Sequence, residues 1–203
     1  MSELTASNPG RVKVEFFKTY LRYHYFQKYI LITLAIIFLP FLIGMALFSL
    51  IAAAVCAGLW YGILGLAIYF RRNYIYEQFY HGDLRPGVVV GLNPMMIAVQ
   101  TDLVFMSPKE YPVIKMIRYE LPAIGGEEPK VGKRVATVAL YYVTWKCPHF
   151  NDFNPIPVEC ATDDVKIQRR AVKRIPAEDW QLLKEDLRYI EKPYRYKLYK
   201  LWQ

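Results

Sequence analysis

Between positions 29 and 70 the chain has no Asp, Glu, Lys, Arg or His. A membrane-spanning helix needs about 20 apolar residues at a rise of roughly 1.5 Å per residue, so an uncharged run about twice that long predicts two helices that cross a bilayer and return. A cleaved signal peptide does not fit, because the run is too long, starts too late and is followed by Arg71 and Arg72 instead of small residues. The sequence therefore predicts a transmembrane helical hairpin over residues 29–70.

Residues that bind metals or attack substrates are scarce. The chain has 3 cysteines and 3 histidines, and they form no C-x-x-C or H-x-x-x-H pair. Gly125-Gly126 lacks the Gly-Lys-Ser/Thr ending of a phosphate-binding loop. We therefore predict no catalytic residue, no cofactor and no metal site. Turns and helix caps account for the carboxylates of the C-terminal half, which include Asp102, Glu159, Asp163 and Asp164.

Within the hairpin, Pro40 and Gly44 interrupt the first half and predict a kink. The reversal is expected near residues 48–50, which leaves a second helix over about residues 51–70. Its glycines are spaced so that another helix can approach closely, and these predicted helix-packing residues are Gly58, Gly62 and Gly65. Either the first helix of the same chain or a helix of a second copy could occupy this face.

The flanks of the hairpin are basic and its turn is uncharged. Positive charge marks the cytoplasmic side of a membrane protein, so both ends are expected in the cytoplasm of a bacterium, with the hairpin in the inner membrane. The net charge of +8 favours anionic headgroups as a partner over nucleic acid. The cations predicted to lie at the lipid surface are Lys18, Arg22, Lys28, Arg71, Arg72, Arg195, Lys197 and Lys200. Cys147 and Cys160 are then expected as free thiols, because the cytoplasm is reducing.

Four regions follow from these patterns. Residues 1–28 form an N-terminal tail and an interfacial helix, although the helical part could equally extend the first transmembrane helix. The hairpin at 29–70 is followed by a juxtamembrane helix at 71–81. Residues 82–203 form a cytoplasmic β-rich domain with C-terminal helices and a basic aromatic tail.

The predicted fold class is α+β. Alternation, β-branched residues and turn signals predict five strands in a small barrel or rolled sheet, near residues 88–90, 95–103, 112–121, 135–145 and 157–162. The prolines at 148, 155 and 157 place residues 146–157 in a loop. Two helices follow, one capped by Asp163 and one opened by Pro176.

Several strand and turn patterns in this domain resemble a bacterial family catalogued as a domain of unknown function. The resemblance covers about residues 82–190 and implies a single bacterial domain, without implying an activity. The patterns are Pro86-x-Val88-Val89-Val90, Thr101-Asp102-Leu103, Tyr111-Pro112-Val113, Val135-x-Thr137-Val138, Asp152-Phe153-x-Pro155 and Ile175-Pro176-x-Glu178-x-Trp180.

Two classes of function are consistent with the sequence. We favour a membrane-anchored interaction or scaffold module of a bacterial membrane assembly, without catalytic activity, whose partner is a membrane protein or a second copy. The alternative is a membrane-tethered enzyme, which would need Asp102, His149 and Cys160 to converge in a pocket of the β-domain. A basic helical face at residues 166–174 could be solvated, or could contact headgroups, an acidic protein or RNA.

Overall fold

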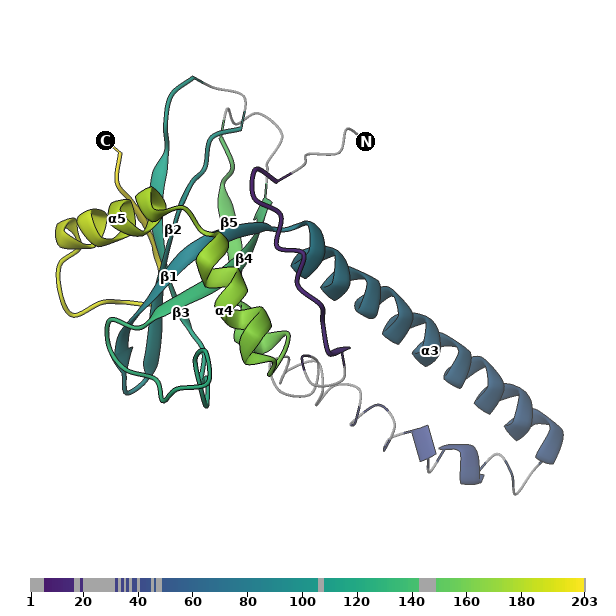
Figure 1. The fold of residues 1–203 in the computed structure, drawn as a ribbon. Coiled ribbons are helices and arrows are strands. Elements are labelled where there is room, and N and C mark those ends of the chain that lie inside the picture. Colours follow the sequence, from purple (N-terminus) through teal and green to yellow (C-terminus); the bar gives the residue numbers. More distant parts are fainter. Residues whose placement is uncertain are drawn as a thin grey trace. The chain divides into compact units, whose positions relative to one another are not determined.

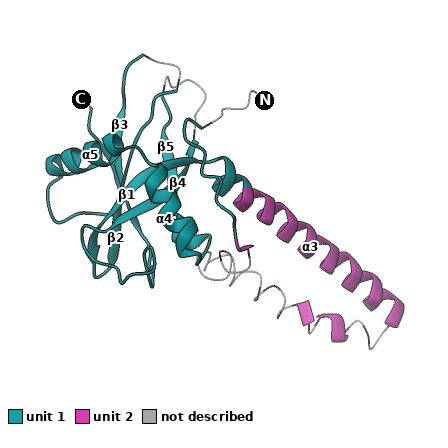
Figure 2. Cartoon of the chain, viewed as in Figure 1, with its two compact units in different colours: residues 1–14, 77–203 teal, residues 15–76 magenta. Residues whose placement is uncertain are grey.

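The computed structural model describes residues 6–16, 19, 32, 34, 36, 38–39, 41–44, 46, 49–105, 108–142 and 149–202 (Figure 1). The chain forms two compact units (Figure 2). One is Glu15–Tyr76, and the other combines Met1–Val14 with Glu77–Gln203. The second unit is thus discontinuous in sequence, whereas the sequence pattern placed its start at residue 82 and left the N-terminal tail outside it.

Helix α3 (Leu50–His81) supplies most of the described part of the first unit. Ser49 precedes the helix, and its hydroxyl accepts a hydrogen bond from the Ala52 backbone N–H at 3.4 Å, as an N-cap does. Within the described ranges, α3 is the one helix long and apolar enough to cross a membrane. The helix expected separately at 71–81 is continuous with it, because no helix breaker occurs before Gly82.

The described residues between 32 and 46 also have helical backbone. The ring of Phe38 stacks on that of Trp60, with centroids 4.5 Å apart. These two residues are equidistant in sequence from Ser49, which is the pattern of two helices folded back on each other. The kink expected at Pro40 and most of the interfacial helix expected before residue 28 lie outside the described residues.

The second unit is built on a six-stranded antiparallel sheet. The strand order is β5-β4-β1-β2-β3-β6. The strands are β1 (Asp83–Leu92), β2 (Met95–Asp102), β3 (Pro112–Arg118), β4 (Arg134–Tyr142), β5 (Asp152–Pro157) and β6 (Leu198–Lys200). Apolar residues of the four inner strands form the core, and Val89, Ile97, Val99, Ile114 and Val135 are completely buried.

The sheet is strongly curled. Lys115 of β3 places its Nζ 2.9 Å from both carboxylate oxygens of Asp152 and 2.6 Å from the carbonyl oxygen of Phe153, both in β5. In a flat sheet β3 and β5 would be about 19 Å apart, at roughly 4.8 Å per strand, which a lysine side chain cannot reach. The curling brings β3 and β5 together. Of the two predicted architectures, a small barrel or a rolled sheet, the structure has the rolled sheet.

The number of strands corrects the expected five. The last strand was expected at 157–162, but β5 covers 152–157 and is followed by the short 3₁₀ helix η1 (Val158–Cys160). Prolines are tolerated in β5 because it is an edge strand that pairs with β4 alone, with Pro155 opposite Ala139. The sixth strand, β6, comes from the basic tail and pairs with β3.

Two helices pack on the sheet, α4 (Val165–Arg174) against β4 and α5 (Ala177–Asp186) against β1 (Figure 1). A 3₁₀ turn, η2 (Leu187–Tyr189), extends α5. The N-cap of α4 is Asp164, one residue later than expected, and its carboxylate accepts from the Lys166 N–H at 2.8 Å. Pro176 precedes α5 at its N-cap position, in agreement with a helix opened there.

A strap formed by residues 7–12 completes the second unit. Its backbone runs beside the end of α3 and the start of β1, where Gly10 N–H donates to Gly82 O, Arg11 N–H to Tyr80 O and Leu84 N–H to Asn8 O. A side chain at Gly10 would meet the Phe79 carbonyl oxygen at 2.5 Å, so only glycine allows this approach. These hydrogen bonds fix residues 7–10, which the sequence pattern had assigned only to an N-terminal tail.

Candidate functional site

The cations expected at the lipid surface fall into three groups. Lys18, Arg22 and Lys28 lie outside the described residues. Arg71 and Arg72 lie on α3 directly after its uncharged part, and the Arg71 guanidinium stacks over the Tyr74 ring at 5.2 Å. An arginine on an aromatic ring at this position has the chemistry of a membrane interface.

The third group lies in the basic tail, where Arg195, Lys197 and Lys200 are all exposed. The Lys197 ammonium lies 4.5 Å from the Tyr199 ring centre, and that of Lys200 lies 5.4 Å from Trp202. Pairing of β6 with β3 fixes Leu198–Lys200 on the domain, while Arg195 and Lys197 lie just before the strand. The exposed cations of the tail remain available to an anionic surface.

The glycines expected to pack helices together are open. A side chain at Gly58, Gly62 or Gly65 would meet no atom within 4 Å among the described residues. Most of the first helix lies outside the described residues, so both occupants considered for this face, that helix or a helix of a second copy, stay predictions.

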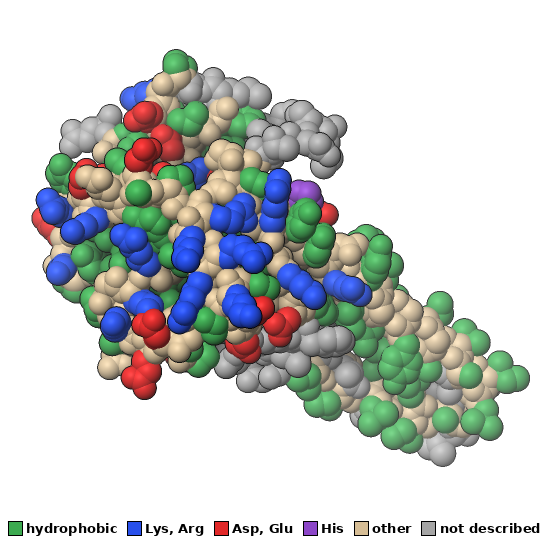
Figure 3. All heavy atoms as spheres, viewed as in Figure 1, with side chains coloured by type: hydrophobic (Ala, Val, Ile, Leu, Met, Phe, Trp, Pro, Cys, Tyr) green, Lys and Arg blue, Asp and Glu red, His purple; other side chains and the backbone are tan. Residues whose placement is uncertain are grey.

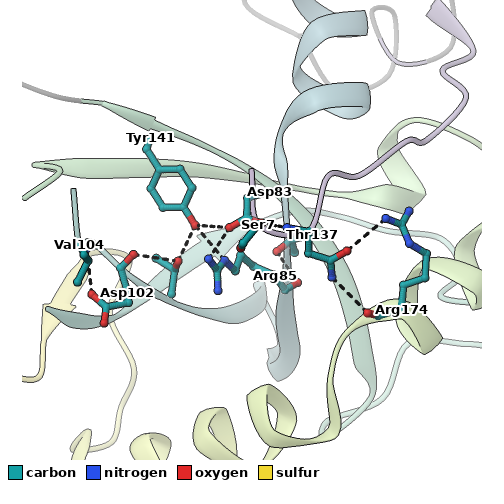
Figure 4. A network of polar contacts seen from close by, with 10 residues as sticks. Ser7, Asp83, Arg85, Asp102, Val104, Thr137, Tyr141 and Arg174 are labelled. Atoms are coloured by element: carbon teal, nitrogen blue, oxygen red, sulfur yellow. Dashed lines mark hydrogen bonds and ion pairs between the residues drawn. The ribbon is translucent and has the colours of Figure 1, made fainter. Parts of the chain in front are cut away.

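A polar network ties the strap to the β-domain (Figure 4). Asp83, which is 3% exposed, accepts from the Asn8 backbone N–H at 3.1 Å and forms an ion pair with Arg85. Arg85 Nε donates to the Tyr141 hydroxyl at 2.9 Å, and that hydroxyl donates to Asp83 at 3.1 Å. Burial raises the pKa of Tyr141, which keeps the phenol protonated at neutral pH.

Arg174, at the end of α4, holds the other side of the strap. Its guanidinium donates to the carbonyl oxygens of Gly10 at 2.6 Å and Pro9 at 2.5 Å, and to the Asn8 amide oxygen at 3.2 Å. Asn8 in turn donates to the Arg174 carbonyl oxygen. The polar groups of this network are hydrogen-bonded to one another, and their role is to hold residues 7–12 against the β-rich unit. The sequence offered no signal for it, because the strap is short and polar and Arg174 was grouped with a solvated face.

The residues considered for an enzyme site do not converge. Asp102 uses its carboxylate to accept from the N–H groups of Val104 and Tyr111 at 2.9 and 2.8 Å. His149 contacts Tyr111 near that end of the sheet. Cys160 is completely buried and follows the far end of β5, a strand of about 20 Å at 3.3 Å per residue.

Metal ligation finds no support in the part of the chain that the structure describes. Within it, His, Cys, Asp and Glu side chains do not gather into any group that could hold a metal ion. Among the described residues, Cys56 and Cys160 form no disulfide. Cys147, expected as a third free thiol, lies outside the described residues.

Comparison with known proteins identifies the family of the β-rich unit. A search of curated proteins gives no match. One solved structure, described as a "putative membrane protein from Corynebacterium diphtheriae", is similar with 24% sequence identity and a TM-score of 0.49, over 59% of this chain and 100% of that one. A family model matches residues 71–191, which include α3 from Arg71 onward, the five strands β1 to β5 and the helices α4 and α5. The chain therefore belongs to the family described as "Protein of unknown function (DUF3239)".

Proposed function

We propose that the protein is a membrane-anchored interaction module, in which a helical hairpin at residues 29–70 holds the β-rich unit at the cytoplasmic face of the bacterial inner membrane. The strap carries this proposal. Residues 7–12 are bonded to residues 79–84 and to Arg174, so the chain leaves the folded unit before the apolar run and returns to it afterwards. If the run enters a membrane, it must therefore cross an even number of times.

Two crossings fit the length of the run. The uncharged part of α3, residues 50–70, would be about 30 Å long at roughly 1.5 Å per residue, which matches the hydrocarbon core of a bilayer. Most of its large apolar side chains are exposed, with Leu50, Ile51 and Leu59 each more than half exposed. Such exposure is unfavourable in water and expected in lipid. The cap at Ser49 and the contact of Phe38 with Trp60 support a turn where the sequence placed it.

The charges on both flanks support the orientation. Arg71 and Arg72 follow the run directly, and the exposed cations of the tail add positive charge on the β-rich unit. At about 1 kcal/mol for each basic residue near an anionic surface, these groups favour contact of the unit with the cytoplasmic leaflet.

The module acts by binding a partner within the membrane. The open face at Gly58, Gly62 and Gly65 suits close approach of a helix from another membrane protein or from a second copy. Crosslinking in native membranes, with Gly62→Cys introduced into a Cys56→Ala chain, decides between them. A crosslinked dimer identifies a second copy as the partner, whereas an uncrosslinked chain excludes a second copy at this face.

Protease protection tests the topology. With a tag at each end of the chain, both tags should survive protease added to right-side-out spheroplasts, and both should be removed once the spheroplasts are lysed. Loss of either tag from intact spheroplasts would contradict the proposed orientation.

A further inference from the structure

A cavity of about 480 Å³ lies between α4, η1 and the loop that precedes β4. Its size falls in the range of pockets that hold small molecules. The cavity is lined by five cationic side chains, which are Lys130, Lys133, Arg134, Arg169 and Lys173. On the same side of the molecule, Lys and Arg side chains gather over the face that carries α4 and α5 (Figure 3).

The floor of the cavity contains a buried carboxyl group. Among the lining residues, Ile124, Glu159 and Gln168 are 1%, 3% and 5% exposed, whereas the cations are exposed or half-buried around them. Glu159 Oε2 has no hydrogen-bond partner among the described residues. A buried carboxyl oxygen without a partner costs about 1–3 kcal/mol, which makes it a position where an entering polar group would be stabilised.

The wall of the cavity is rigidly built. The turn at Gly125 and Gly126 has positive φ angles of 60° and 82°, and α4 holds it at two points. Gly125 N–H donates to Gln168 Oε1 at 3.0 Å, and Arg169 Nε donates to the Gly125 carbonyl oxygen at 3.1 Å. Gln168 is fixed in turn by its bond to the Thr162 carbonyl oxygen at 2.8 Å. A site with its wall fixed in advance loses little entropy on binding.

Positive charge in the cavity is only partly compensated. Glu127 pairs with Lys133 at 2.5 Å, and the Arg134 guanidinium lies over the Trp180 ring at 5.0 Å. Burial raises the pKa of Glu159 to about 7, so this carboxyl is only partly ionised at neutral pH. Lys130 and Arg169 also lie near the Glu127 carboxylate, but the five lining cations outnumber the carboxylates of the cavity and leave positive charge to attract an anion.

We infer that this cavity binds a small phosphate-bearing ligand, whose phosphate is held by Lys130, Lys173 and Arg169 and whose neighbouring hydroxyl group bonds Glu159. The recessed floor selects a compact molecule rather than a polymer surface. The ligand could be a soluble phosphate ester or the headgroup of a phospholipid, because both offer this chemistry. The inference does not depend on the membrane topology proposed above.

Calorimetric titration of the full chain in uncharged detergent micelles tests the site. Glycerol 1-phosphate should bind, inorganic phosphate should bind more weakly, and glycerol should not bind. Binding should protect Lys130 and Lys173, but not Lys166, from acetylation as measured by mass spectrometry. Micelles doped with phosphatidylglycerol distinguish the sources, because protection of the same two lysines by the lipid identifies a headgroup site and protection by the soluble ester alone identifies a metabolite site.

Two sets of variants give the decisive comparison. The double variant Lys130→Gln/Lys173→Gln should weaken glycerol 1-phosphate binding at least tenfold. The variant Lys166→Gln/Arg170→Gln, which removes two charges from outside the cavity, should change it less than twofold. Glu159→Gln should weaken glycerol 1-phosphate binding while leaving inorganic phosphate unchanged. Absence of binding by both phosphate probes, or equal weakening by the two double variants, would overturn the inference.

Discussion

Burial raises the pKa of Glu159 from an ordinary value near 4.5 to about 7. Between these two pH values the folded protein keeps a proton on Glu159 that the unfolded chain releases. The stability that this proton contributes is fully present below pH 4.5 and is lost as the pH rises through 7. Between pH 5 and pH 8 the free energy of unfolding of the wild-type protein should therefore fall by about 2–3 kcal/mol relative to that of Glu159→Gln, whose side chain cannot titrate.

Urea unfolding of the full chain in detergent, followed by tryptophan fluorescence, measures this difference. The wild type and the Gln variant share every other titrating group, so the difference between their pH profiles isolates Glu159. Parallel profiles across this range would show that Glu159 is already ionised in the folded protein.

Gly126 and Gly132 provide a matched pair for backbone strain. Both have positive φ angles, 82° and 85°, but a side chain at Gly126 would lie 3.0 Å from a Val165 methyl group whereas Gly132 faces open space. Each Ala substitution should cost about 1–2 kcal/mol for the left-handed conformation. Gly126→Ala should cost more than Gly132→Ala because Val165 must also move, and thermal unfolding of the two variants compares them. Equal melting temperatures would mean that the turn shifts freely.

The roles of individual side chains were harder to predict from the sequence than the elements that carry them. Glu159 was assigned to a turn or cap and Arg174 to a solvated face, because local spacing does not disclose what folds over a residue. Gly125 and Gly126 do not form a phosphate-binding loop of the nucleotide type, yet Gly125 lines the basic cavity. Only the tertiary structure brings α4 against that turn.

Among the elements, the strap depends on Arg174. Arg174→Ala leaves the carbonyl oxygens of Pro9 and Gly10 without their charged donor, which should cost about 2 kcal/mol. The amides of residues 10–12 should then exchange with deuterium faster, because their hydrogen bonds to α3 open more often. Hydrogen exchange with mass spectrometry reads this directly. Arg170→Ala, on the same helix but exposed, serves as the control and should leave exchange unchanged.

Elements with strong alternation were predictable, and elements defined by their neighbours were not. The four inner strands and both C-terminal helices were expected close to where they lie, since β-branched runs and helix caps are local signals. Strand β5 was hidden by its prolines, which only an edge position permits. Strand β6 was read as a membrane-surface tail, because three residues are too few to show a period. The hairpin was expected from the absence of charge, and its first half largely lies outside the described residues.

At the scale of the whole molecule, the strap makes the number of membrane crossings testable. Deleting residues 30–48 would leave one span and place residues 7–12 on the opposite side from the domain. We expect the strap amides to lose their protection more completely in this variant than in Arg174→Ala, because every hydrogen bond to the domain is then lost, as measured by hydrogen exchange in membranes. Full protection would mean that the run does not cross the membrane twice.

The division of the β-rich unit between the two ends of the chain sets an order of events during synthesis. Asn8 and its partner Arg174 are separated by 166 positions. At a translation rate of about 5–20 residues per second, the strap leaves the ribosome roughly 8–30 seconds before α4 exists to receive it. The first segment to be made must therefore wait for a partner near the other end of the chain. Until α4 has been made, the oxygen atoms of residues 8–10 lack their Arg174 donor.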